Sequence, residues 1–228
     1  DEALKLYRKS LELKESTLGY ENQSTLATMA NLGDHLSKMG RLKEAKEILE
    51  KASDYHCKIL GTKNIGTLNT KSFLANLLLQ YGQNIEAIAI NKEVLEINKN
   101  ELGRGHPETL GSSHNLGVSL DSIGEHEKAE ELLVFALEER KKVLGIDHPS
   151  TLNTASCLAQ CFHGLGKLTE AKTLYFETLE REQLIKGKEH IETLLTMSNL
   201  AVLLSELDEN NEALELLNEC TDLMEEYK

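Results

Sequence analysis

The segment Leu-Gly-Arg-Gly-His-Pro-Glu-Thr-Leu at residues 102–110 returns at residues 144–152 as Leu-Gly-Ile-Asp-His-Pro-Ser-Thr-Leu. The two segments are 42 residues apart, and further Leu-Gly pairs stand at 18–19 and 60–61 in the same register. Thr-Leu pairs at 25–26, 67–68 and 193–194 extend the pattern in both directions. A fixed period of this size indicates stacked copies of one supersecondary unit.

Two further ladders share this register. Alanine stands at 45, 87, 129, 171 and 213, and glycine stands at 40, 82, 124 and 166, where Asp208 replaces the next member. Within one unit, apolar residues between 24 and 39 fall on one face at 3.6 residues per turn, and a second amphipathic helix is expected at about 42–60. Gly40 and Gly61 are expected to end these two helices. Each unit is therefore predicted to be a helix A, a turn and a helix B.

The predicted fold is all-α, with about 11 helices in a single repeat array over residues 1–228. Residues 1–19 are expected to form helix B of a truncated repeat. Complete repeats are predicted at 20–61, 62–103, 104–145 and 146–187, and a last repeat at 188–228. Since the chain opens in the middle of a repeat, we expect it to be a segment of a longer array.

Composition excludes several classes of function. A net charge of −13 disfavours binding to nucleic acid or to anionic lipid, both of which need concentrated Lys and Arg. The sequence has no run of about 18 apolar residues, so no membrane span is predicted. No signal peptide is expected either, because the first residues already have the apolar spacing of an amphipathic helix. The four cysteines have no disulfide-framework spacing. We therefore expect a cytoplasmic protein with reduced cysteines.

The spacing Leu32-Gly33, Leu36, Gly40, Ala45, Leu49 and Ala52 resembles the tetratricopeptide consensus. The 42-residue length and the Leu-Gly-x-x-His-Pro-x-Thr-Leu turns are similar to the kinesin light chain subtype. This resemblance implies a right-handed α-α superhelix, a solenoid whose inner surface is lined by the A helices. It also implies a protein-binding scaffold rather than an enzyme.

The binding surface implied by this resemblance consists of A-helix positions that point away from the A–B core. Small and neutral polar residues dominate these positions, and Lys38 is the one formal cation among them. The predicted partner-binding residues are Asp34, Lys38, Asn69, Ser72, Asn76, Gln80, His114, Asp121, Asn153, Ser156, Gln160, His163 and Ser198.

We expect a non-enzymatic adaptor whose concave groove holds an extended, neutral or basic peptide or protein segment, mainly through Asn69, Asn76, His114, Asn153 and Gln160. Amide groups can hydrogen-bond to an extended backbone. The same residues could equally be solvated side chains on an unused face. Two other functions stay open: a sensor arm of a multidomain nucleotide-binding signalling protein, and a structural array that self-associates through uncapped ends.

No catalytic residues, cofactor or metal site are predicted. The segment Gly164-Leu165-Gly166-Lys167 resembles the end of a phosphate-binding loop, but Cys161 occupies the place of that motif's first glycine. Cys157 and Cys161 are one helical turn apart, yet His163 is expected on a different side of that helix. A zinc site formed by these three residues is therefore not expected.

Overall fold

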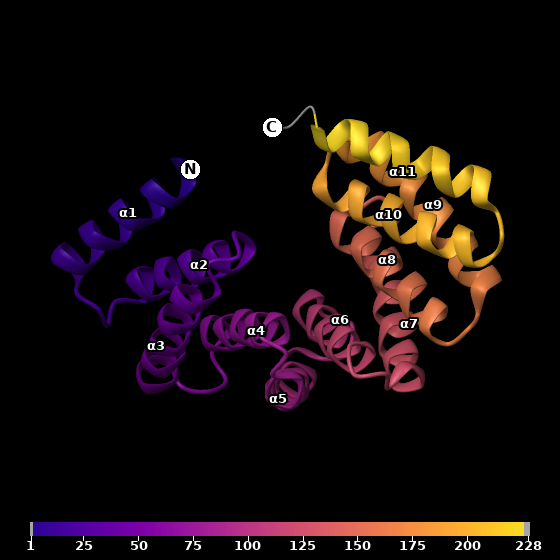
Figure 1. The fold of residues 1–228 in the computed structure, drawn as a ribbon. Coiled ribbons are helices and arrows are strands. Elements are labelled where there is room, and N and C mark those ends of the chain that lie inside the picture. Colours follow the sequence, from indigo (N-terminus) through magenta and orange to yellow (C-terminus); the bar gives the residue numbers. More distant parts are fainter. Residues whose placement is uncertain (1, 226–228) are drawn as a thin grey trace. The chain divides into compact units, whose positions relative to one another are not determined.

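A computed structural model describes residues 2–225 of the chain (Figure 1). Within these residues the regular elements are eleven helices, which confirms the predicted all-α repeat fold. The bounds are α1 Glu2–Leu18, α2 Gln23–Lys38, α3 Leu42–Leu60, α4 Ile65–Gln80, α5 Asn84–Leu102, α6 Pro107–Asp121, α7 His126–Val143, α8 Pro149–Gly164, α9 Leu168–Lys186, α10 Ile191–Glu206 and α11 Asn210–Glu225.

The helices group into two compact units. Residues 1–104 form unit 1, which contains α1 to α5, and residues 105–228 form unit 2, which contains α6 to α11. In both units an A helix packs on the B helix that follows it and on the next A helix of the same unit, as α2 does with α3 and α4. The predicted organisation as a single array with the repeat boundaries given above stays a prediction.

Small residues allow the two helices of a pair to approach closely. The alanines at 45, 87, 129 and 171 are fully buried. On the facing helix, a Cβ added at Gly33 would lie 2.5 Å from Leu49 Cγ, and one added at Gly117 would lie 2.8 Å from Leu133 Cγ. Both distances are too short for carbon atoms in a packed core. The leucine side chain of helix B therefore occupies the space left by a missing methyl group on helix A.

The helix ends follow the turn sequences. Asn22, Asn64, His106, His148 and His190 are the N-caps of the five A helices, and each side chain accepts a hydrogen bond from the N–H two residues further on. The B helices end as expected at glycines such as Gly61, which has φ +84°. At the turn between helices A and B, where Gly40 has φ +73°, the equivalent Asp208 has φ +61°, a value that Asp tolerates better than most residues. The caps satisfy orphan backbone groups at every repeat.

A polar joint connects the B helices α1, α3 and α7 to the A helix that follows each of them. Lys14 Nζ donates to Thr28 Oγ1 at 2.8 Å, and His56 Nδ1 lies 2.9 Å from Thr70 Oγ1. In unit 2, Arg140 donates to the Thr154 hydroxyl and, at 2.8 Å, to the Ser150 carbonyl. The threonine is constant, whereas its partner is a lysine, a histidine or an arginine. The joint therefore tolerates different side chains that can reach one buried hydroxyl.

We expect replacement by alanine to have opposite effects on the free energy of unfolding at the two glycines of α6. Replacing Gly111 or Gly117 by Ala raises helix propensity by about 1 kcal/mol in either case. A Cβ at Gly111 meets only Arg140 Nη2, at an ordinary 3.6 Å. Overpacking against Leu133 should cost Gly117→Ala about 1–3 kcal/mol. We expect Gly117→Ala to have the lower free energy of unfolding of the two variants, measured by urea denaturation; equal values would contradict the close A–B approach.

We expect His56 to make unit 1 less stable at acidic pH. Burial lowers the pKa of His56 from its usual 6.5, so below that pH the unfolded state binds more protons than the folded state. The free energy of unfolding should therefore fall as the pH drops below 6.5. His56→Asn places there the residue type of the equivalent Asn98, and we expect it to reduce this slope in urea titrations at several pH values. An unchanged slope would show that His56 does not contribute.

Candidate functional site

All thirteen predicted partner-binding residues lie on A helices, so their positions can be described one unit at a time. In unit 1, Asn69, Asn76 and Gln80 of α4 are exposed and Ser72 is half-buried. Gln80 Nε2 donates to Oγ of the buried Ser37 of α2 at 2.9 Å, which joins the two A helices. Lys38 is exposed but forms an ion pair with Asp34 at 2.7 Å. The one cation predicted on this surface is thus already neutralised by its neighbour.

A pocket of about 140 Å³ lies between α2 and α4 in unit 1. Its lining is Gln23, Ala27, Ala30, Asn31, His56, Gly66, Asn69, Thr70 and Phe73. Asn69 is one of the predicted partner-binding residues, whereas the exposed Asn31 and the half-buried Phe73 are not. The approach of α2 and α4 shows that Asn31 also borders the pocket.

This pocket is polar without being ionic. Among the described residues that line it, none is acidic, lysine or arginine. Burial lowers the pKa of His56, which keeps its imidazole neutral at pH 7. Asn31 and Asn69 each offer an amide donor and an amide acceptor at the exposed rim. The pocket can therefore take a small side chain while its rim hydrogen-bonds to a main chain.

In unit 2, four predicted residues lie on α8. Gln160 is exposed, and Asn153, Ser156 and His163 are half-buried. Ser156 Oγ lies 3.2 Å from Thr196 Oγ1, and His163 Nε2 lies 2.7 Å from Glu206 Oε2, so both side chains contact α10. On α10 itself, Ile191, Leu195 and Val202 are 61%, 54% and 52% exposed. The A-helix face of unit 2 is therefore more apolar at α10 than at α8.

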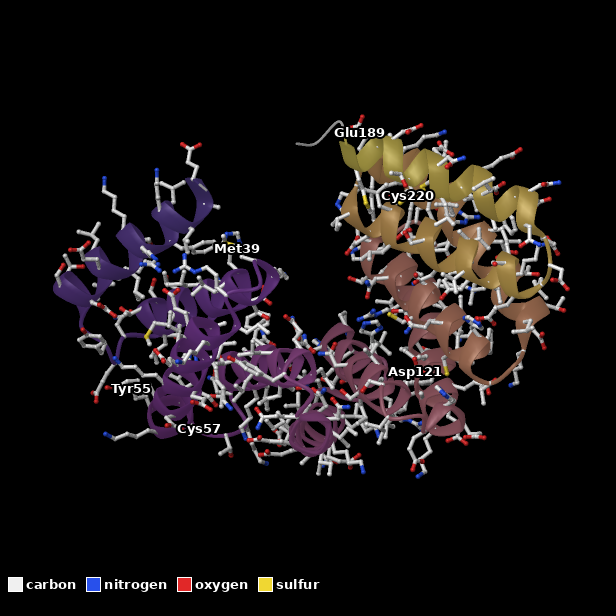
Figure 2. The ribbon with its side chains drawn as sticks, viewed as in Figure 1. Met39, Tyr55, Cys57, Asp121, Glu189 and Cys220 are labelled. Carbon is white, nitrogen blue, oxygen red and sulfur yellow. The ribbon has the colours of Figure 1, made fainter. Side chains whose placement is uncertain are left out.

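The three remaining predicted residues, His114, Ser198 and Asp121, interact with residues of B helices. His114 is half-buried, and burial followed by the charge of Arg140 lowers its pKa to about 3, so it stays neutral. Ser198 Oγ lies 3.4 Å from Cys220 Sγ on the paired helix α11 (Figure 2). Asp121 accepts from His126 of α7, with 2.7 Å between Oδ1 and Nδ1. The partner-binding role of all thirteen residues stays a prediction.

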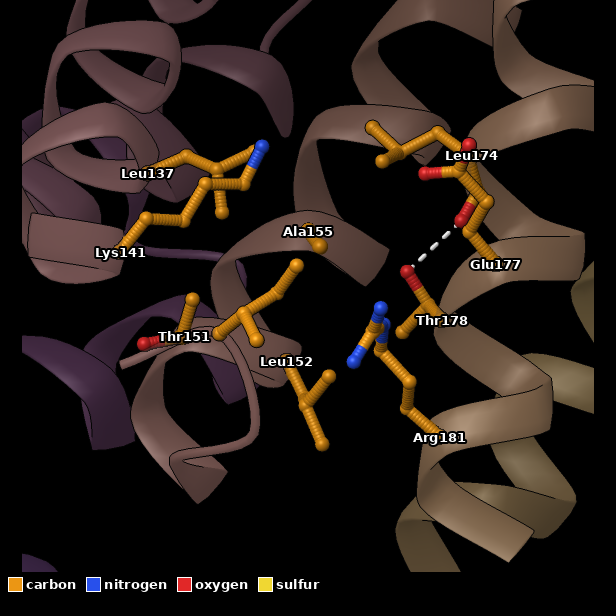
Figure 3. A pocket seen from close by; sticks show the side chains of 10 residues that line it. Leu137, Lys141, Thr151, Leu152, Ala155, Leu174, Glu177, Thr178 and Arg181 are labelled. Atoms are coloured by element: carbon orange, nitrogen blue, oxygen red, sulfur yellow. Dashed lines mark hydrogen bonds between the residues drawn. The ribbon is translucent and has the colours of Figure 1, made fainter. Parts of the chain in front are cut away.

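A second hollow, which the sequence did not reveal, lies on the B-helix side of unit 2. About 440 Å³ of open space is bordered by residues of α7, α8 and α9, including Val134, Leu158 and Phe162. A smaller adjoining cavity of about 30 Å³ shares Leu137 and Leu174 with it, and Figure 3 shows these side chains on either side of Ala155. Its rim carries charges of both signs, among them Lys141 and Glu177. Its outline depends on the α7–α9 spacing.

No helix within residues 2–225 combines the length and the apolar character needed to cross a membrane.

Comparisons with known proteins identify the family. A family model described as tetratricopeptide repeat matches residues 1–58, 66–138, 124–181 and 150–226. Among curated proteins, no sequence matches significantly.

Solved structures share the fold. One is a putative kinesin light chain from Podosopora anserina with nearly identical TPR-like repeats, at 26% identity and a TM-score of 0.68, covering 91% of this chain and 98% of that one. BtubC (BKLC) from P. vanneervenii has 15% identity and a TM-score of 0.74, covering 98% of this chain and 90% of that one.

A third structure is the Rap conjugation gene regulator of the plasmid pLS20 in complex with the Phr* peptide. It has 17% identity and a TM-score of 0.73, and the alignment covers 90% of this chain and 54% of Rap.

The four family-model matches, of which the last three overlap in sequence, together cover almost every residue. With the 42-residue helix pairs and their small-residue ladders, they show that the chain belongs to the tetratricopeptide repeat family.

Proposed function

We propose that this chain is a non-enzymatic adaptor that binds an extended, neutral or basic peptide segment across the A helices of unit 1. The observation that carries this proposal is the uncharged pocket between α2 and α4, with Asn31 and Asn69 at its rim. An extended peptide exposes a main-chain donor and acceptor at each residue, and an amide side chain can pair with both. The pocket beside the amides then selects a side chain that fits about 140 Å³.

Charge supports a neutral or basic ligand. An acidic peptide needs free Lys or Arg, and Lys38 on this face is paired with Asp34. The chain as a whole carries −13, which favours the approach of cationic segments and repels anionic ones. The Rap regulator has a related fold and was solved with a peptide bound, which supports the capacity of such helix pairs to hold a peptide.

An amide-to-alanine double variant tests the pocket. We expect Asn31→Ala/Asn69→Ala to weaken the binding of a neutral or basic peptide about ten- to hundredfold, because each lost hydrogen bond contributes about 0.5–1.5 kcal/mol. Binding is measured by fluorescence anisotropy against peptide pools of matched length and of negative, zero or positive net charge.

Two further variants make this experiment specific. Asn100 is an exposed amide at the end of α5, outside the pocket, and Asn100→Ala should leave affinity unchanged. Ala27 is exposed on α2, and Ala27→Trp should fill the pocket without disturbing the core. Tighter binding of the acidic pool, or equal losses in the Asn100 variant, would contradict the proposal.

Self-association is a second candidate function, favoured by exposed leucines on two helices. Leu6 and Leu13 of α1 are each 62% exposed, and α11 exposes Leu214 and Leu217. Large exposed apolar side chains along one helix can form a contact with another protein. We expect the mass measured by light scattering to rise with concentration, and Leu6→Lys/Leu13→Lys to abolish the rise. A constant monomer mass for the unsubstituted chain would exclude this function.

A further inference from the structure

Three side chains that can bind a metal meet in unit 2. Asp121 ends α6, His126 begins α7, and Cys161 lies on α8. Their ligating atoms all lie within 4.8 Å of one another. His126 Nδ1 is 2.7 Å from Asp121 Oδ1, and the Cys161 thiol donates to the His126 main-chain carbonyl at 3.2 Å. We infer that Asp121, His126 and Cys161 form a binding site for a divalent transition-metal ion of the zinc type.

The repeats themselves show that the fold does not require these residues here. Within the two units, the corresponding sets are Ser37 with Leu42 and Leu77 on α2, α3 and α4, and His163 with Leu168 and Leu203 on α8, α9 and α10. Both sets are mainly apolar, as expected for packing between stacked helices. Of these three sets, the one on α6, α7 and α8 combines a carboxylate, an imidazole and a thiol. A purely structural requirement therefore does not explain the cluster.

Gly164 provides an independent observation about the shape of the site. A Cβ added at this residue would lie 2.6 Å from Cε1, 2.8 Å from Nδ1 and 2.9 Å from Nε2 of His126. The equivalent residues in the other repeats are Lys38, Gln80, Ser122 and Glu206. The imidazole thus occupies a space that is available because residue 164 lacks a side chain. The missing side chain at Gly164 therefore lets the imidazole ring of His126 lie between α8 and the Asp121 carboxylate.

The donor set fits a borderline-soft ion. Thiolate sulfur, imidazole nitrogen and carboxylate oxygen are the usual protein ligands of zinc, and three of them leave one position for water. The thiolate and the carboxylate together neutralise a charge of +2. On binding, the thiol proton leaves to solvent, and the hydrogen between Nδ1 and Oδ1 is transferred through solvent to Nε2, so that the imidazole stays neutral and the Nδ1 lone pair binds the ion. Glu130, one turn after His126, is held by Lys167 at 2.6 and 2.7 Å and is not counted as a ligand.

The same three residue types could suggest a cysteine nucleophile, but the surroundings of Cys161 oppose that role. Its side chain is fully buried, and burial, followed by the negative charge of Asp121, raises the pKa of the thiol to about 12. A nucleophile needs the opposite, a thiolate stabilised at an accessible position.

Cobalt substitution tests the site with a direct spectroscopic readout. Co²⁺ is titrated into the untagged chain of residues 1–228, and absorption is followed in the region of thiolate-to-cobalt charge transfer. We expect one equivalent to produce this band and one equivalent of Zn²⁺ to remove it. Cys161→Leu should abolish the band, and His126→Leu should weaken binding by more than tenfold.

These variants are chosen so that loss of folding does not obscure the result. Leu occupies the position of Cys161 in Leu77 and Leu203, and the position of His126 in Leu42 and Leu168, so both substitutions suit the repeat. Circular dichroism checks that each variant is helical. Cys57→Ser and Cys157→Ser are the controls, since neither cysteine belongs to the cluster, and both should keep the band.

Gly164→Ala gives a test in which all three ligands remain. The added methyl group should displace the imidazole and weaken Co²⁺ binding about 10–100-fold, the range seen when the support of a ligand is lost. The inference is overturned if the unsubstituted chain gives no charge-transfer band. It is equally overturned if the band survives in Cys161→Leu or disappears in Cys157→Ser.

Discussion

The structure depends on the close approach of helices A and B within each repeat. That approach requires a small residue at one position of each helix, which is why the alanines at 45, 87, 129 and 171 are fully buried. Leu49 and Leu133 then fill the space beside Gly33 and Gly117. Since a B helix also contacts the following A helix within its unit, the spacing inside one pair determines where the next pair can pack. The surfaces of α2 and α4 thus take their separation from residues that no ligand touches.

The residues that maintain this packing are few, and they leave the exposed face of helix A free to vary. The position of Asn69 holds Ala27 in the previous repeat and Leu195 in the last one. The fold is unaffected because these side chains point away from the paired helix. A ligand, by contrast, meets an amide, a methyl group or a leucine at the same backbone position. Binding chemistry in such a chain is therefore set repeat by repeat, on a scaffold whose spacing stays constant.

The periodic features could be predicted from sequence because one residue type recurs for one physical reason. Asn22 and His148 stand at the same turn of their repeats, and both are N-caps in the structure. The polar joint could not be predicted, since Lys14, His56 and Arg140 share no chemistry beyond their ability to reach a threonine hydroxyl. Only part of the pocket could be predicted from the sequence. Asn69 follows from the helical pattern, whereas the contribution of Asn31 depends on the distance between α2 and α4.

The cluster of Asp121, His126 and Cys161 links the packing between repeats to the exposed face of an A helix. It lies between repeats of unit 2, and leucines such as Leu77 and Leu168 stand at the positions of Cys161 and His126 in other repeats. An ion coordinated by α6, α7 and α8 would fix these helices by bonds far stiffer than leucine contacts. Gln160, next to Cys161 in the chain, is exposed on the A-helix face of α8. Coordination of the thiolate would therefore restrict the helix that presents Gln160, and by linkage a partner bound there would change the affinity for the ion in equal measure.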